Sequence, residues 1–127
     1  MTLRQYRELA EFRYALRRFL RHSERLTRGS GLTPLQYQLL LQIKGLPARE
    51  LATIGTLAER LQAKHHGVVA LATRCERLGL VSRRASLKDR RKIYLVLSRK
   101  GSRALQRLAL AHRDELLELH KRFPVIA

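Results

Sequence analysis

Apolar positions recur every three or four residues near both ends of the chain, and this spacing predicts a long helix in each place. The first covers residues 3–26, and the last runs from Gly101 to a stop at Pro124. In both helices the apolar residues cover more than one face, which a helix on the surface of a monomer does not need. We therefore expect these two helices to pack together across a two-fold axis.

Three shorter helices are predicted between them. Thr33 followed by Pro34 is a strong start signal for a helix over residues 34–45, and Thr53 can cap a helix over residues 54–61. A third begins at residue 64 or 65 and runs to Leu78, where Gly79 stops it. Its core positions are Val68, Leu71, Ala72, Cys75 and Leu78. The last two of these helices, joined by a tight connection, predict a helix-turn-helix.

The pattern then changes to the alternation of β-strands. LVSRR and IYLVLS predict two strands joined by a loop from Arg84 to Lys92. A basic hairpin after a helix-turn-helix is a winged helix. The predicted fold class is thus mainly α with a small β-hairpin, as one domain over residues 1–127. Within it, residues 33–100 form the winged helix-turn-helix lobe, and residues 1–28 and 101–127 form a dimerisation layer.

The charge favours a polyanion as partner. The 127 residues carry 27 Lys and Arg against 10 Asp and Glu, a net charge of +17, while 45% are hydrophobic. The chain is therefore too apolar for a disordered basic tail and too basic for an ordinary enzyme. Residues 64–100 hold eleven basic residues and two acids, which makes them the expected electrostatic footprint. No phosphate-cradling glycine loop, nucleophile elbow or metal-binding helix motif is present, so an enzyme is not expected.

Three further features of the sequence indicate in which cellular compartment the protein is found. No apolar run is long enough for a membrane span, and the charged start MTLRQYRELAEFR lacks the apolar middle of a signal peptide. The single cysteine, Cys75, cannot form an internal disulfide, which agrees with a reducing environment. We expect a cytoplasmic protein that has no membrane partner.

Three stretches, in this order, resemble the MarR family of bacterial transcription regulators, along essentially the whole chain. LTPLQYQLL is similar to the opening of the family's second helix, and LAERLQAKHHGVVALATRCERLGLV to its helix-turn-helix and exit. DRRKIYLVLSRKG is the most specific stretch, because it resembles the family's wing signature. The matching positions are Asp89, Arg90, Arg91, Leu95, Leu97, Ser98 and Gly101.

The resemblance implies a homodimer joined through its terminal helices, with two winged lobes on a pseudo-palindromic operator in double-stranded DNA. It also implies a cleft between dimer layer and lobes, where a small aromatic or other effector loosens DNA binding. The predicted function is a sequence-specific repressor released by such an effector. The alternative is a nonspecific or architectural nucleic-acid-binding protein, which the charge alone would support. His66, Gly67 and Ala70 differ from the residues common in the family's recognition helix.

Ten residues are candidates for contact with DNA. The start of the recognition helix should read bases in the major groove, and the hairpin tip should meet phosphate or enter the minor groove. The candidates are Lys64, His65, His66, Gly67, Val69, Arg74, Arg84, Lys88, Arg90 and Arg91. Arg74 can contact either phosphate or Asp89. Because Asp89 has the wrong charge for DNA, we expect it to orient a neighbouring arginine through a salt bridge.

Two further groups have a structural and a functional interpretation. Cys75 lies on the apolar face of its helix, which favours a packing role over redox sensing. The aromatic rings of Phe12, Phe19, Tyr37 and His112 are weak candidates for effector binding, since aromatic residues at helical spacing are more often core. The adjacent histidines His65 and His66 point about 100° apart on a helix and do not easily share a metal. We expect neither a metal nor a cofactor.

Overall fold

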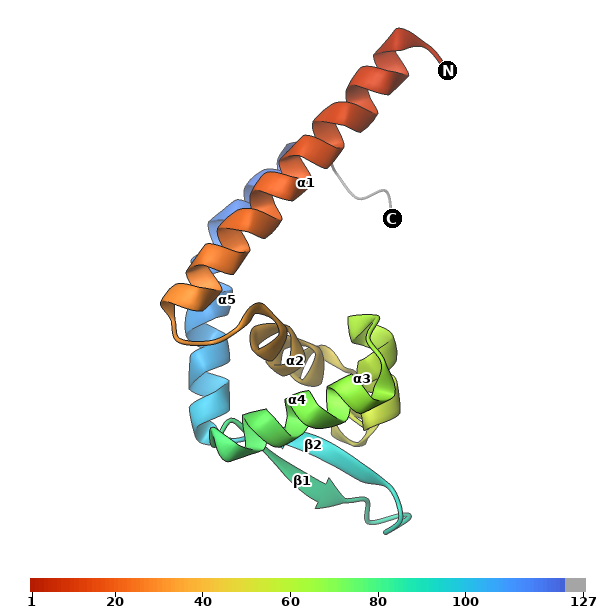
Figure 1. Cartoon of the computed structure of the whole chain (residues 1–127), viewed down its shortest axis with the longest axis vertical. Coiled ribbons are helices and arrows are strands. Elements are labelled where there is room, and N and C mark those ends of the chain that lie inside the picture. Colours follow the sequence, from red (N-terminus) through yellow and green to blue (C-terminus); the bar gives the residue numbers. More distant parts are fainter. Residues whose placement is uncertain (123–127) are drawn as a thin grey trace.

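The computed structural model describes residues 1–122 (Figure 1). The elements in order are α1 (Leu3–Gly29), α2 (Pro34–Gly45), the 3-10 helix η1 (Arg49–Leu51), α3 (Ile54–Leu61), α4 (His65–Arg77), β1 (Val81–Ala85), β2 (Ile93–Leu97) and α5 (Arg99–Arg122). The fold is mainly α with one antiparallel hairpin, which confirms the predicted fold class. The predicted stop at Pro124 lies outside the described residues.

Two parts are evident in Figure 1. α1 and α5 lie side by side and form an elongated arm, whereas α2, α3, α4 and the hairpin form a lobe at one end of it. The hairpin lies at the end of the molecule farthest from the N-terminus. α2 contacts both α1 and α5, so it joins the lobe to the arm.

The helices begin where the sequence places capping residues. Thr33 accepts a hydrogen bond from the Gln36 amide, and Thr53 caps α3 in the same way. α1, however, ends at Gly29, three residues later than predicted. The reason is that Thr27 is buried and its hydroxyl donates to the Ser23 carbonyl at 2.7 Å, so its polar side chain does not interrupt the helix.

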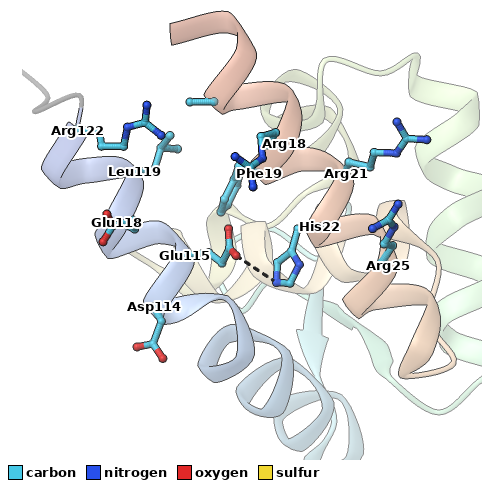
Figure 2. A pocket seen from close by; sticks show the side chains of 11 residues that line it. Arg18, Phe19, Arg21, His22, Arg25, Asp114, Glu115, Glu118, Leu119 and Arg122 are labelled. Carbon is cyan, nitrogen blue, oxygen red and sulfur yellow. Dashed lines mark ion pairs between the residues drawn. The ribbon is translucent and has the colours of Figure 1, made fainter. Parts of the chain in front are cut away.

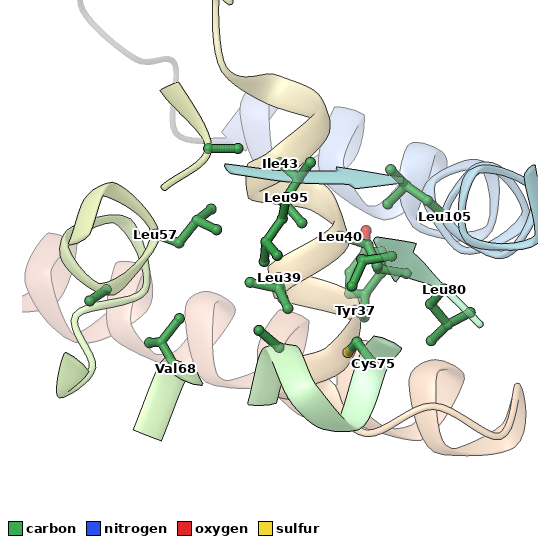
Figure 3. Close-up of a cluster of buried hydrophobic side chains, with 14 of the residues drawn as sticks. Tyr37, Leu39, Leu40, Ile43, Leu57, Val68, Cys75, Leu80, Leu95 and Leu105 are labelled. Carbon is green, nitrogen blue, oxygen red and sulfur yellow. The ribbon is translucent and has the colours of Figure 1, made fainter. Parts of the chain in front are cut away.

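The core of the lobe surrounds α2 (Figure 3). Leu39 and Leu40 are fully buried, and they meet side chains from α3, α4, β2 and α5. Val68, Ala72 and Cys75 face this core as predicted. Leu78 does not, because 39% of its surface remains exposed. Its helix has ended one residue earlier, at Arg77.

The hairpin differs from prediction at its base. β1 pairs with β2 from Val81 opposite Leu97 to Ala85 opposite Ile93, so Arg84 belongs to a strand and not to the loop. The connection between α2 and α3, for which the sequence pattern predicts no helix, contains the short helix η1. Just after η1, the carbonyl of Ala52 accepts a hydrogen bond from the Leu95 amide at 2.9 Å. β2 is therefore held on both of its edges.

Within residues 1–122, none of the helices combines the length and apolar character needed to cross a membrane.

Candidate nucleic-acid interface

The first turn of α4 has free backbone donors. Lys64 occupies the N-cap position and makes no capping hydrogen bond with its side chain. In the part of the chain that the structure describes, the other α-helices start with a hydroxyl cap, at Thr2, Thr33, Thr53 and Ser98. Because uncapped N–H groups at a helix N-terminus attract anions, this turn is suited to a phosphate.

The outer face of α4 is accessible. Val68 is 1% exposed and packs into the core, whereas the neighbouring Val69 is 38% exposed. A β-carbon on Gly67 would meet no atom within 4 Å, so the backbone there is open to close approach. α4 therefore buries one side in the lobe and presents the other to solvent.

At the hairpin tip, Asp89 organises the turn. One of its carboxylate oxygens accepts a hydrogen bond from the Arg91 amide at 3.1 Å and pairs with the Arg91 Nε at 3.3 Å. The Asp89 carbonyl accepts from the Lys92 amide at 2.9 Å. The predicted salt bridge from Asp89 is confirmed with Arg91 as partner, and the suggested pairing of Asp89 with Arg74 is wrong. The Arg91 side chain remains 92% exposed.

The base of the tip is anchored by a residue pair that the sequence did not indicate. Ser86 is buried, and its hydroxyl donates to Glu50 in η1 at 3.2 Å while accepting from the Lys88 amide. This pair joins residues 36 positions apart in the chain. The tip is thus fixed to the body of the lobe, while the basic side chains of Lys88, Arg90 and Arg91 remain exposed.

A second anchor connects the hairpin to the recognition helix. Arg83 lies on β1 and donates to Glu76 at 2.7 Å and to Thr73 at 3.2 Å, both on α4. Sequence reasoning missed these three residues, although the alternation of β1 could have placed Arg83 on the face that meets α4. The contact sets the orientation of the hairpin relative to α4.

All ten predicted contact residues are exposed: Lys64, His65, His66, Gly67, Val69, Arg74, Arg84, Lys88, Arg90 and Arg91. The first turn of α4 and the hairpin tip lie on the same side of the lobe, away from the start of α5 (Figure 1). The side chain of Arg74 makes no hydrogen bond or ion pair within residues 1–122. The arrangement thus combines a cationic helix start with a cationic loop on one surface.

Comparisons with known proteins agree with this geometry. A sequence profile described as MarR family matches residues 30–92. The chain belongs to the MarR family. Among curated proteins, none matches the sequence significantly.

Solved structures of the same fold include MarR-family proteins. A MarR family protein from Bacillus stearothermophilus has a TM-score of 0.77 at 22% identity, with 98% of this chain and 86% of that chain covered. The M. tuberculosis transcriptional regulator MosR, in complex with DNA, has a TM-score of 0.63 at 28% identity, covering 89% and 80%. An S. aureus MepR mutant bound to an oligodeoxyribonucleotide has a TM-score of 0.72 at 18% identity, covering 93% and 85%.

Three of the four aromatic candidates for effector binding in this MarR-family chain lie together. His112 on α5 stacks on Tyr37 of α2 and meets the ring of Phe19 on α1 edge-on, at 6.4 Å between centroids. Its Nδ1 donates to the Leu108 carbonyl, and its Nε2 is 2.7 Å from the Ser23 hydroxyl. His112 and Tyr37 are buried, so these rings pack against one another instead of lining a cavity between them.

Phe12 is separate from this cluster. It lies two turns before Phe19 on α1, is 41% exposed and lines a shallow surface depression with Met1 and Leu9. The four aromatic residues proposed for one effector site therefore do not form a single site.

Cys75 is fully buried, and burial raises the pKa of its thiol above the usual value. A raised pKa leaves little thiolate, which is the reactive form. The prediction that Cys75 packs in the core is confirmed.

Within residues 1–122, no cluster of three or more His, Cys, Asp or Glu side chains is placed to hold a metal ion.

Proposed function

We propose that this MarR-family protein is a transcription regulator that binds double-stranded DNA in a sequence-specific manner. The observation that carries the proposal is the uncapped first turn of α4, next to exposed Lys64 and His65, on the same side of the lobe as a cationic hairpin tip. α4 would read bases in the major groove, and the tip would contact phosphate or the minor groove. MosR and MepR carry DNA in structures of this fold, which supports the same partner here.

The proposed functional form is a homodimer joined through the arm. Large apolar side chains of α1 and α5 remain exposed in a single chain, as a subunit interface requires. They are Leu3, Tyr6, Leu9, Phe12, Tyr14, Leu20, Leu110, Leu116 and Leu117. Two lobes related by a two-fold axis would bind half-sites about one helical turn apart, which makes the operator a pseudo-palindrome.

The proposed sign of control is repression in the bacterial cytoplasm, relieved by a small effector. An effector that binds better to one separation of the lobes would shift the population away from the DNA-binding arrangement. The regulators of this class act by binding and not by catalysis, so the chain needs no catalytic residue or cofactor.

One observation favours the alternative of a nonspecific nucleic-acid-binding protein. α1 carries eight arginines and three glutamates, and α5 carries seven basic and three acidic residues, net charges of +5 and +4. Together these exceed half of the total of +17, although both helices lie outside the lobe. Such charge would attract polyanions without reading sequence.

The deciding experiment is to sequence the genomic DNA fragments that the purified protein retains at about 150 mM salt, where nonspecific electrostatic binding is already weak. A regulator should enrich a few sites that share an inverted repeat, with a ratio of specific to nonspecific affinity of about 10³ or more. Uniform retention of all fragments would reject sequence-specific regulation and favour the architectural role.

A further inference from the structure

Six of the eight arginines of α1 lie on one side of the helix. Successive residues of a helix are about 100° apart, and these six side chains fall within a sector of about that width, with the adjacent Arg17 and Arg18 at its two edges. We call this surface the arginine stripe. Its members are Arg7, Arg17, Arg18, Arg21, Arg25 and Arg28. From Arg7 to Arg28 the stripe extends for about 31 Å, at a rise of 1.5 Å per residue.

The guanidinium groups of the arginine stripe are available to a partner. All six residues are exposed. Arg18 lies over the ring of Tyr14, 5.7 Å from its centroid. The side chains of the other five make no hydrogen bond or ion pair within residues 1–122. Because like charges three or four residues apart on a helix repel one another, an anion that lies along the stripe would relieve this repulsion.

The acids of α1 do not neutralise the stripe. Glu8 pairs with Arg4 at 3.2 Å and Glu11 pairs with Arg122 at 3.7 Å, both outside the stripe. Glu24 borders the stripe and forms no ion pair in the part of the chain that the structure describes. The stripe therefore keeps almost all of its positive charge.

The acids of α5 lie on another side of α1. Figure 2 shows the depression between α1 and α5, where the acids Asp114, Glu115 and Glu118 line the side formed by α5. Glu115 lies 3.6 Å from His22, which is not part of the stripe. Arg21 and Arg25 point away from α5 in this view. The stripe is thus directed to solvent and not toward these acids.

The composition and length of the stripe favour the backbone of double-stranded DNA. A guanidinium group can pair with a phosphate through two parallel hydrogen bonds, and every basic residue of the stripe is an arginine. Its length of about 31 Å is close to one turn of B-DNA, about 34 Å. A duplex therefore presents phosphates along the whole stripe.

The apolar residues of α1 argue against a membrane surface as the partner. A helix that lies on a membrane needs apolar side chains beside its basic ones. Leu9, Phe12 and Leu20 lie outside the sector of the stripe, and within it the ring of Tyr14 is covered by Arg18. A dimer joined through these three apolar residues would leave the stripe open.

We propose that the arginine stripe binds the phosphate backbone of a second DNA duplex, so that the protein joins two DNA segments. One segment lies on the lobe, as in the proposed function, and the other lies along the arm. The stripe belongs to the arm, whereas the hairpin tip lies at the end of the molecule farthest from the N-terminus (Figure 1). Since phosphate contacts carry no sequence information, the second segment can have any sequence.

The first test measures bridging by the purified full chain. A biotinylated duplex that carries an enriched genomic site is held on beads, the protein is bound to it, and a fluorescent duplex of unrelated sequence is added. We expect the beads to retain the fluorescent duplex at about 50 mM salt and to lose it at about 200 mM, because about six phosphate contacts lose about 10³-fold in affinity over this range. No retention above that of beads without protein would overturn the proposal.

A triple variant locates the second site. Arg17→Gln with Arg21→Gln and Arg28→Gln removes three charges from the stripe, and glutamine keeps the helix because its helix propensity is similar to that of arginine. Bridging should be lost, and the slope of log K against log salt for the second duplex should fall by about three. Affinity for the enriched site, measured by fluorescence anisotropy, should change less than twofold. Bridging equal to that of the unmodified protein would overturn the proposal.

The matched control removes the same charge from α5. Arg99, Arg103 and Arg113 are exposed and lie outside the stripe. The triple variant Arg99→Gln with Arg103→Gln and Arg113→Gln should still bridge two duplexes. Loss of bridging equal to that of the stripe variant would mean that total charge and not the stripe is responsible, and would overturn the proposal.

A lobe variant separates this proposal from the proposed function. Lys64→Gln with Arg90→Gln and Arg91→Gln weakens the lobe and leaves the stripe intact. It should still bind a duplex of any sequence at about 50 mM salt, and adding the three stripe substitutions should abolish that binding. If no operator exists, the proposed function fails, but this residual binding still supports the stripe. If an operator is bound and the lobe variant binds no duplex, only the stripe proposal fails.

Poly-glutamate as a competitor distinguishes DNA from an acidic protein. A flexible polypeptide loses conformational freedom when it lies along the stripe, whereas a duplex is already stiff. We therefore expect poly-glutamate of equal total charge to displace the duplex from the lobe variant only at about tenfold excess or more. Tighter binding of poly-glutamate than of the duplex would indicate an acidic protein partner and overturn the proposal.

Discussion

The imidazole of His112 lies flat on the phenol ring of Tyr37, with ring centroids 5.0 Å apart and ring planes within 7°. His112 is on α5 of the arm and Tyr37 is on α2 of the lobe, so the stack is a direct connection between the two parts of the molecule. The ring is also held at both nitrogens, by the Leu108 carbonyl and the Ser23 hydroxyl.

Substitutions at position 112 should separate stacking from hydrogen bonding. His112→Phe keeps an aromatic ring on Tyr37 but loses both hydrogen bonds, and we expect the free energy of unfolding to fall by about 1–2 kcal/mol. His112→Ala also leaves a cavity and should cost about 3 kcal/mol. Urea denaturation measures both. His120→Ala, an exposed position on the same helix, is the control and should have little effect; equal losses in all three variants would contradict this role.

The elements that the sequence predicts correctly are those with local signals. Thr33 with Pro34 and Thr53 cap their helices through neighbours three residues away, so the chain itself carries the information. The predicted contact residues are exposed because basic side chains at a hairpin tip and helix start have no apolar face to bury them.

The features that were missed depend on distant partners. Ser86 is buried because Glu50, 36 positions earlier, lies against it. Leu78 fits the helical period of the core positions but lies beyond the end of α4, where the chain turns at Gly79 with a φ of 75°. Periodicity predicts which residues share a face only as long as the helix continues.

Substitution of Gly67 by alanine should stabilise the folded protein but weaken its binding to DNA. Gly67 lies in the first turn of α4 and has open space around it, so Gly67→Ala should raise the free energy of unfolding by about 0.5–1 kcal/mol. If DNA approaches this backbone closely, the added methyl group should weaken operator binding. Thermal denaturation and fluorescence anisotropy measure the two effects.

Gly45→Ala is the matched control for this prediction, because Gly45 is also helical and also open but lies at the end of α2. It should leave DNA affinity unchanged. Operator binding by Gly67→Ala as tight as that of the unmodified protein would remove Gly67 from the interface.

Asp89 should support DNA binding through the shape of the turn that it forms and not through its negative charge. Asp89→Asn keeps an oxygen that can accept from the Arg91 amide while removing the negative charge, so DNA binding should be equal or tighter. Asp89→Ala removes the acceptor as well and should weaken binding. Filter binding at several salt concentrations measures both, and weaker binding by Asp89→Asn would contradict this interpretation.

The exposed guanidinium of Arg91 predicts a change in salt dependence. Arg91→Ala should weaken binding to all sequences and reduce the slope of log K against log salt by about one, since one phosphate contact is lost. Arg113→Ala removes an exposed arginine from the arm and should leave the slope unchanged. An unaltered slope for Arg91→Ala would exclude this residue as a phosphate contact.

Burial of Cys75 predicts slow chemistry and a defined pH dependence. The pKa of its thiol is raised by desolvation, so iodoacetamide should label it slowly in the folded protein and rapidly in urea. The folded pKa of the thiol lies above the unfolded value of about 8.5. The stability that the buried, protonated Cys75 contributes is therefore complete below about pH 8.5 and is lost as the pH rises through the folded pKa. Loss of operator binding with peroxide, absent in Cys75→Ser, would instead indicate redox sensing.

The exposed leucines of α5 predict the oligomeric state. Leu110 and Leu117 are 58% and 52% exposed and lie seven residues apart, hence on nearly the same line of the helix. In a dimer joined through the arm they would be buried, so the double substitution Leu110→Glu with Leu117→Glu should separate the subunits and halve the molar mass measured by light scattering. Leu87→Glu provides the control, since Leu87 is 94% exposed at the hairpin tip, outside the arm. A monomeric unmodified protein, or a double variant with unchanged mass, would exclude this surface as the subunit interface.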